Sequence, residues 1–119
     1  MRLLVIAWLA FVVGISLLPY PAKIFLGTTG AFHKIGHYAT FAITAAILCW
    51  GTAGLRRKLT CSFAALSLAV VLETIEAVQY HNPIEWRDLV LDAAGILSGF
   101  LFVTVIVPKA LATQGRARK

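Results

Sequence analysis

Residues 59–80 read LTCSFAALSLAVVLETIEAVQY, an apolar run of helix length that carries two glutamates, Glu73 and Glu76. A charged side chain at membrane depth costs about 2.5 to 3.5 kcal/mol on insertion scales. Such side chains usually face the interior of a helix bundle or a water-filled cavity, where they mark functional sites. The run therefore predicts a membrane-spanning helix with a functional site toward its C-terminal end.

Three further apolar runs of similar length cover residues 3–18, 35–55 and 89–107. Each approaches the ~20 residues that a helix needs to cross the hydrocarbon core. The 119 residues are 60% hydrophobic and 13% charged, whereas soluble domains are about 45–50% apolar and about 25% charged. Because lipid cannot satisfy open backbone groups, helices are expected rather than isolated strands. The sequence predicts an all-α integral membrane protein, with a four-transmembrane-helix bundle over residues 1–109 and a short basic cytoplasmic tail over residues 110–119.

The basic residues indicate how the four predicted spans are oriented. Cytoplasmic loops collect Lys and Arg, and most basic residues fall into three regions that a four-span topology places on one side: Arg2, the block Arg56, Arg57 and Lys58, and the tail residues Lys109, Arg116, Arg118 and Lys119. The N and C termini are therefore expected in the cytoplasm. No nucleic-acid partner is predicted, because no nucleic-acid-binding motif accompanies these charges.

Polar residues of three predicted spans fall at one depth, close to the non-cytoplasmic ends of the helices. With a rise of about 1.5 Å per residue, Glu76 lies about 6 Å and Glu73 about 10 Å below Tyr80. Two histidines four residues apart open the second span, and two aspartates four residues apart begin the fourth. The predicted binding residues are His33, Lys34, His37, Glu73, Glu76, Gln79, Arg87, Asp88 and Asp92.

The residue types in this layer suggest how they act together. Burial disfavours a charged carboxylate and a nearby imidazole opposes that effect, so Glu76 and His37 are expected to form an ion-paired or proton-sharing couple. Asp92 would supply a second acceptor. Lys34 and Arg87 lie at the rim and suit an anionic group that arrives from outside, because both can donate to phosphate.

Two glycines four residues apart, Gly95 and Gly99, follow Asp92 in the fourth span. Small residues at this spacing let two membrane helices approach closely. They are expected to serve helix packing, and the close approach would press Asp92 against a neighbouring helix.

Three blocks follow one another along the chain: HKIGHY at residues 33–38, EAVQ at 76–79 and DLVLDAAG at 88–95. In order and spacing they resemble the VanZ-like family of small membrane proteins, which takes its name from a glycopeptide-resistance accessory protein. The resemblance covers about residues 17–100. It implies a multi-pass protein of the bacterial inner (cytoplasmic) membrane with a role in the cell envelope, and it implies no defined reaction.

The chain departs from the family pattern at several positions. His33 stands where the family usually has Asp, and Asp92 replaces the family's Asn, which adds a negative charge to the predicted pocket. The Arg expected after the Glu-x-x-Gln block falls near Asn82, and Arg87 is the nearby substitute.

The favoured hypothesis is a binding protein whose outward-facing polar pocket recognises the headgroup of a membrane lipid or an envelope precursor. One alternative is an accessory or structural subunit that packs against a membrane-protein partner or a second copy. Another is a hydrolase or transferase on an envelope lipid, with Glu76 as general base and His37 as its acid–base partner. No nucleophile lies in a recognisable motif, so neither residue is more than a catalytic candidate.

A metal site is a weaker hypothesis. The spacing of His33 and His37 puts two imidazoles on one helix face, and Glu76 or Asp92 could complete a ligand set. The glutamate that lies between the histidines of the metalloprotease motif is absent here, and Lys34 beside His33 disfavours a cation. No metal or other cofactor is therefore predicted.

Overall fold

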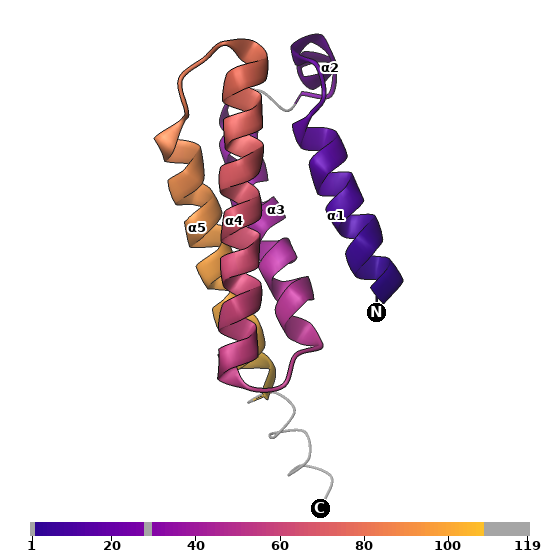
Figure 1. Cartoon of the computed structure of the whole chain (residues 1–119), viewed down its shortest axis with the longest axis vertical. Coiled ribbons are helices and arrows are strands. Elements are labelled where there is room, and N and C mark those ends of the chain that lie inside the picture. The colour runs from indigo at the N-terminus through magenta and orange to yellow at the C-terminus, as the bar shows by residue number, and fades with distance from the viewer. Residues whose placement is uncertain (1, 28–29, 109–119) are drawn as a thin grey trace, which may run out of the picture.

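The computed structural model describes residues 2–27 and 30–108, which form helices and no strand (Figure 1). The elements are α1 (Arg2–Ser16), α2 (Tyr20–Phe25), α3 (Ala31–Trp50), α4 (Leu55–Tyr80), α5 (Trp86–Leu101) and the π-helical segment η1 (Phe102–Ile106), which continues α5. The prediction of an all-helical fold is confirmed. The predicted basic tail, residues 110–119, lies outside the described residues.

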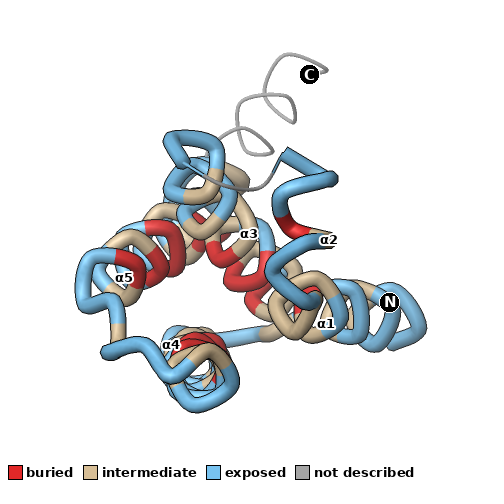
Figure 2. Tube along the Cα trace, turned by 90° about the horizontal axis from the view of Figure 1, so that it is seen from above, coloured by how far each residue is buried: buried red, intermediate tan, exposed pale blue. Residues whose placement is uncertain are grey.

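Helices α3, α4 and α5 pack side by side, and α1 lies along the outside of this group (Figures 1 and 2). Helices α3 and α5 run in the same direction, while α1 and α4 run in the opposite direction. Buried apolar residues of α1, α3, α4 and α5 form the core: Val12, Phe41, Ala45, Ala65, Ala69, Leu72 and Ile96. The Trp8 indole N–H donates to the Thr44 hydroxyl at 2.9 Å, which joins α1 to α3.

The closest helix pair is α3 with α5, and two glycines permit the approach. Gly95 faces the backbone carbonyl of Tyr38, and Gly99 faces that of Ala42 one turn further along. A methyl group at either glycine would overlap the facing carbonyl oxygen. The glycine spacing therefore acts as expected of small residues between membrane helices, by bringing two backbones together.

Several helix boundaries differ from those expected. Helix α3 ends at Trp50, because Gly51 and Gly54 form the turn and Gly54 takes a φ of +87°. Helix α4 then starts at Leu55, so the basic residues 56–58 belong to its first turn rather than to a loop. Helix α2 was not expected at all. Pro21 lies in its first turn, where the fixed φ of proline suits a helix start.

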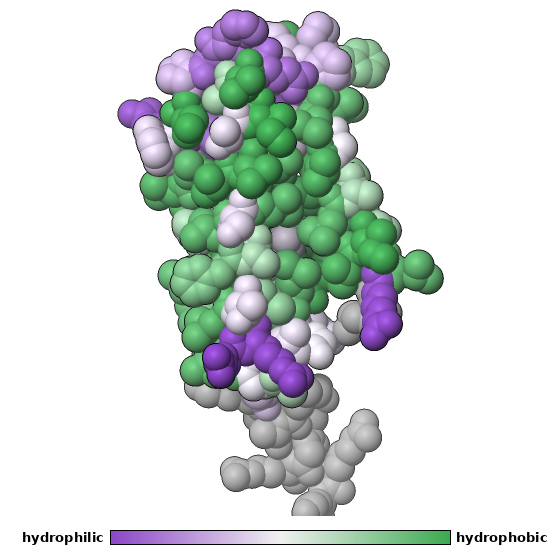
Figure 3. All heavy atoms as spheres, in the orientation of Figure 1, coloured by the Kyte–Doolittle hydropathy of each residue, from purple (hydrophilic) through white to green (hydrophobic). Residues whose placement is uncertain are grey.

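Two described helical stretches, Leu55–Tyr80 and Trp86–Ile106, are long and apolar enough to cross a membrane. Helix α1 has only 15 residues, a length of about 22 Å against a hydrocarbon core of about 30 Å. Helix α3 has 20 residues, but two histidines and a lysine in its first two turns make it more polar. Seen from the side, the molecule has an apolar band between two polar ends (Figure 3). The crossing by all four predicted spans stays a prediction.

Candidate functional site

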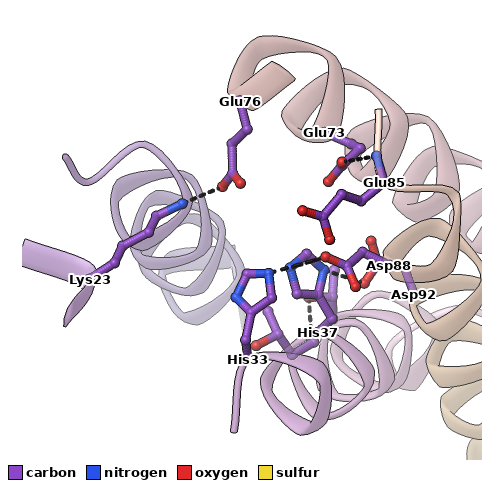
Figure 4. A network of polar contacts seen from close by, with 10 residues as sticks. Lys23, His33, His37, Glu73, Glu76, Glu85, Asp88 and Asp92 are labelled. Carbon is purple, nitrogen blue, oxygen red and sulfur yellow. Dashed lines mark hydrogen bonds and ion pairs between the residues drawn. The ribbon is translucent and has the colours of Figure 1, made fainter. Parts of the chain in front are cut away.

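Ionisable side chains from four helices meet inside the bundle near the end that carries α2 (Figure 4). Lysine and histidine come from α2 and α3, and carboxylates come from α4 and α5. We call this group the polar cluster, and its members are Lys23, His33, His37, Glu73, Glu76, Asp88 and Asp92. Four helices therefore supply one site.

Two histidines of α3 each contact an aspartate of α5. The Nε2 atom of His33 lies 3.1 Å from Oδ2 of Asp88, and Nδ1 of His37 lies 2.9 Å from Oδ1 of Asp92. Each pair is one helical turn from the other, because the parallel helices advance in step. The two imidazole rings pack edge to face with centroids 4.6 Å apart. The Oδ2 atom of Asp88 also lies 3.8 Å from Nε2 of His37.

Both aspartates are almost completely buried, with 2% of Asp88 and 1% of Asp92 exposed. The connection between α4 and α5 explains the burial of Asp88. A Glu73 carboxylate oxygen accepts a hydrogen bond from the backbone N–H of Glu85 at 2.8 Å, so the connection folds back along α4. Helix α5 consequently begins below the end of α4 (Figure 1), and Asp88 in its first turn is buried while Trp86 and Arg87 are exposed.

Lys23 of α2 reaches across to α4. Its ammonium lies 2.7 Å from a carboxylate oxygen of Glu76 and 5.4 Å from the centre of the Tyr80 ring. The Tyr80 hydroxyl in turn donates to the backbone carbonyl of Leu18, just before α2. Only 8% of Lys23 is exposed, so the lysine anchors α2 to the upper turns of α4.

A cavity of about 110 Å³ lies beside the polar cluster. Its lining combines polar residues, which are Ser16, Lys23, His33, His37, Thr40 and Glu76, with Ile15, Phe32, Gly36 and Phe41. The cavity therefore brings an ammonium, two imidazoles and a carboxylate next to an apolar wall.

The structure brings most of the predicted binding residues together but pairs them differently. Glu76 hydrogen-bonds with Lys23, and His37 with Asp92, so the expected couple of Glu76 and His37 is not a hydrogen-bonded pair. The reason is α2, whose lysine occupies the carboxylate. The predicted residues outside the cluster are exposed at the same end of the bundle: Lys34, Gln79 and Arg87.

Lys23 is not among the binding residues predicted from the sequence, so its role in the cluster was missed. One signal was available: Lys23 is the one charged residue between residues 3 and 33, and it follows a Pro-x-Pro pair that can start a helix. A lone lysine in apolar surroundings needs a partner. The contribution of Glu85 could not have been found, because it is made by a backbone N–H group.

Electrostatically, the cluster is acidic unless its histidines are charged or a cation binds. It contains one ammonium, from Lys23, against four carboxylates: Glu73, Glu76, Asp88 and Asp92. A buried ion is stable only when it is paired and hydrogen-bonded. The arrangement can thus hold cations or share protons between imidazole and carboxylate.

Comparison with known proteins does not identify a family for this chain. No protein-family model matches the chain, and no curated protein or solved structure matches it significantly. The VanZ-like resemblance stays a prediction that depends on three sequence blocks, of which two supply the histidines of α3 and the aspartates of α5.

Proposed function

We propose that this chain is a VanZ-like protein of the bacterial inner membrane in which α1, α3, α4 and α5 cross the bilayer. The apolar band between two polar ends supports this proposal (Figure 3), as do the two stretches of spanning length and hydropathy. The start of α1 lies toward the end of the bundle that carries the turn between α3 and α4 (Figure 1). That turn precedes the basic residues 56–58, which favours a cytoplasmic location for this end.

In this orientation the polar cluster lies just below the outer surface, and its function is to bind the polar headgroup of a lipid or an envelope precursor. The observation that carries this proposal is the lining of the cavity, which combines donor side chains with apolar ones. Ammonium and imidazole N–H groups donate to phosphate oxygens. The apolar wall formed by Ile15, Phe32 and Phe41 suits the first carbons of an acyl chain.

The exposed basic residues at the same end favour an anionic headgroup. Lys34 and Arg87 are exposed in the first turns of α3 and α5, where their long side chains can reach the headgroup level of the bilayer. They would attract an anionic lipid, while Lys23 and the histidines would fix it. Selectivity is therefore expected to depend on Lys23 more than on the exposed pair.

Lipid retention measured by native mass spectrometry tests the proposal. The protein is extracted from nanodiscs that contain equal amounts of phosphatidylglycerol and phosphatidylcholine, and the bound lipids are counted. We expect the wild type to retain phosphatidylglycerol preferentially. A hydrogen bond to a charged group contributes about 1.5–3 kcal/mol, so Lys23→Gln should reduce that preference at least about tenfold.

The matched control is Arg57→Gln, which removes an exposed positive charge at the opposite end of the molecule and should leave the preference unchanged. His37→Gln serves as a second variant in the cavity, so that a folding defect in one variant does not decide the result. An equal lipid preference in the wild type and both cavity variants would contradict headgroup binding here.

A further inference from the structure

We propose that His33, His37 and Asp88 form a binding site for a divalent transition-metal ion, with zinc as the best match. One ligand atom from each of these three side chains lies within 4.8 Å of the other two. Two imidazoles and one carboxylate are a common protein ligand set for zinc, with the fourth position left open. The site lies between α3 and α5 (Figure 4), and both histidines line the cavity.

The spacing of the ligand atoms is close to what a metal ion needs. Bonds of about 2.0–2.1 Å in a tetrahedral arrangement put neighbouring ligand atoms about 3.3 Å apart. Oδ2 of Asp88 lies 3.1 Å from Nε2 of His33 and 3.8 Å from Nε2 of His37. These two separations lie on both sides of the ideal value, and the three ligand atoms lie within 4.8 Å of one another, so coordination requires the two imidazoles to move toward a common point.

Asp92 orients His37 through the ring nitrogen that does not face Asp88. Its Oδ1 atom lies 2.9 Å from Nδ1 of His37, and only 1% of Asp92 is exposed. A carboxylate can only accept, so Nδ1 donates, and the neutral imidazole then presents the Nε2 lone pair toward Asp88. Metal-binding histidines almost always have such a carboxylate or carbonyl partner on the other nitrogen. Nε2 of His37 and the Asp88 carboxylate are both electron-rich and would repel each other. A cation bound between them would remove this repulsion.

A second observation points to a missing ligand. The Oδ1 atom of Asp88 is buried and has no hydrogen-bond partner within residues 2–27 and 30–108. Buried carboxylate oxygens are normally satisfied. The cluster also has one ammonium against four carboxylates, and a divalent cation would offset two of these negative charges.

Both sequence arguments against a metal are answered by the fold. Lys34 is exposed while His33 is half-buried, since adjacent residues of a helix do not face the same way. The carboxylate missing between the histidines is supplied by α5, as Asp88. Because His33 and His37 also line the cavity, the open coordination position would face it and accept water or an anionic oxygen.

Metal binding to the purified protein in detergent tests this site with Zn²⁺ and Co²⁺ as probes. After treatment with chelator, the wild type should take up one equivalent of Zn²⁺ per chain by isothermal titration and elemental analysis. Co²⁺ should give the visible absorption of a four-coordinate ion, and X-ray absorption of the zinc form should show imidazole ligands. These wild-type measurements do not depend on any variant.

Variants then assign the ligands. We expect His33→Gln and Asp88→Asn to weaken Zn²⁺ binding at least a hundredfold, and Asp92→Asn to weaken it about ten- to a hundredfold through His37. The matched control is His81→Asn, which changes an exposed histidine after α4 whose left-handed conformation (φ +56°) asparagine tolerates. Less than half an equivalent of zinc on the wild type overturns the proposal. So does unchanged affinity in His33→Gln, provided that circular dichroism shows the helix content of the wild type for this variant of a half-buried residue.

Discussion

The contact between α3 and α5 and the contact between α2 and α4 both include a polar pair, but they are built differently. Between α3 and α5, glycines bring the backbones together, and the aspartates that face the histidines are 1–2% exposed. Between α2 and α4, a six-residue helix is attached by the ion pair of Lys23 with Glu76, supported by Tyr80. One contact depends on backbone shape, and the other depends on side-chain charge.

This difference indicates how the site is divided. Ligand-type groups need fixed positions, and long helices in close contact hold side chains more precisely than a short segment does. The α3–α5 pair is therefore the fixed half of the site. Helix α2 contributes Lys23 to the lining of the cavity, and a bound anion would compete with Glu76 for this lysine. Substitutions in the two halves should consequently change the free energy of unfolding by different amounts and for different physical reasons.

The largest effect is expected from Gly99→Leu, which breaks the α3–α5 contact itself. The new side chain would meet the Ala42 carbonyl, where even a methyl group overlaps. Overpacking costs about 1–3 kcal/mol and occasionally more, so we expect the free energy of unfolding to fall by at least about 3 kcal/mol. Gly14→Leu on α1 is the control, because Gly14 has open space around it. Equal melting temperatures for the two variants would show that the helices are not in close contact.

The next largest effect is expected from Asp92→Ala, which leaves His37 inside the bundle without its partner. Losing this hydrogen bond leaves the imidazole N–H unsatisfied inside the bundle, which costs up to about 3 kcal/mol. Asp92→Asn keeps an oxygen that accepts from Nδ1 of His37, so it should cost only about 1 kcal/mol. Thermal unfolding of metal-free protein in detergent measures both values. If the alanine variant were as stable as the asparagine variant, the hydrogen bond would contribute nothing.

The fixed half of the site was largely predictable from the sequence. The i, i+4 spacing of His33 with His37 and of Asp88 with Asp92 put each pair on one helix face. The spacing of Gly95 and Gly99 predicted close packing of the helix that carries the aspartates. The i, i+4 spacing suffices to predict these contacts, because all of these residues lie on regular helices.

The other half of the site, formed by α2 and its contact with α4, was not predictable, because it depends on irregular backbone. The predicted spans leave residues 19–34 unassigned, although Pro21 lies in the first turn of α2, the helix that brings Lys23 to Glu76. Because Lys23 occupies Glu76, the expected pair of Glu76 with His37 is replaced by the pair of His37 with Asp92. Glu85 acts through its backbone N–H, which carries no sequence signal. Contacts between turns and helices therefore needed coordinates.

A double-mutant cycle of Lys23→Met and Glu76→Gln measures the weaker contact directly. The two side chains are 10% and 17% exposed, and residues in direct contact show coupling free energies of about 0.5–3 kcal/mol. We expect a coupling free energy of about 1 kcal/mol, clearly below the effect of Asp92→Ala. The cycle uses thermal unfolding of both single variants and the double variant in one detergent. A coupling as large as about 3 kcal/mol would place α2 in the fixed half of the site.

The smallest effect is expected from Trp8→Phe, which tests whether α1 belongs to either half. The substitution removes the indole N–H that donates to the Thr44 hydroxyl at 2.9 Å. Thr44 is fully buried, yet its hydroxyl still donates to the Thr40 carbonyl at 2.8 Å. No buried donor is therefore left unsatisfied, and the free energy of unfolding should fall by about 1 kcal/mol or less.

Thr44→Val is the partner variant for Trp8→Phe, because it removes the acceptor and keeps the shape of the side chain. If the hydrogen bond is the main link between α1 and α3, the double variant should be no less stable than the more damaging single variant. Additive losses would mean that packing of the indole ring, rather than its N–H, holds α1 in place. A loss as large as that of Asp92→Ala would make α1 part of the fixed half, because only a helix that positions α3 could have so large an effect.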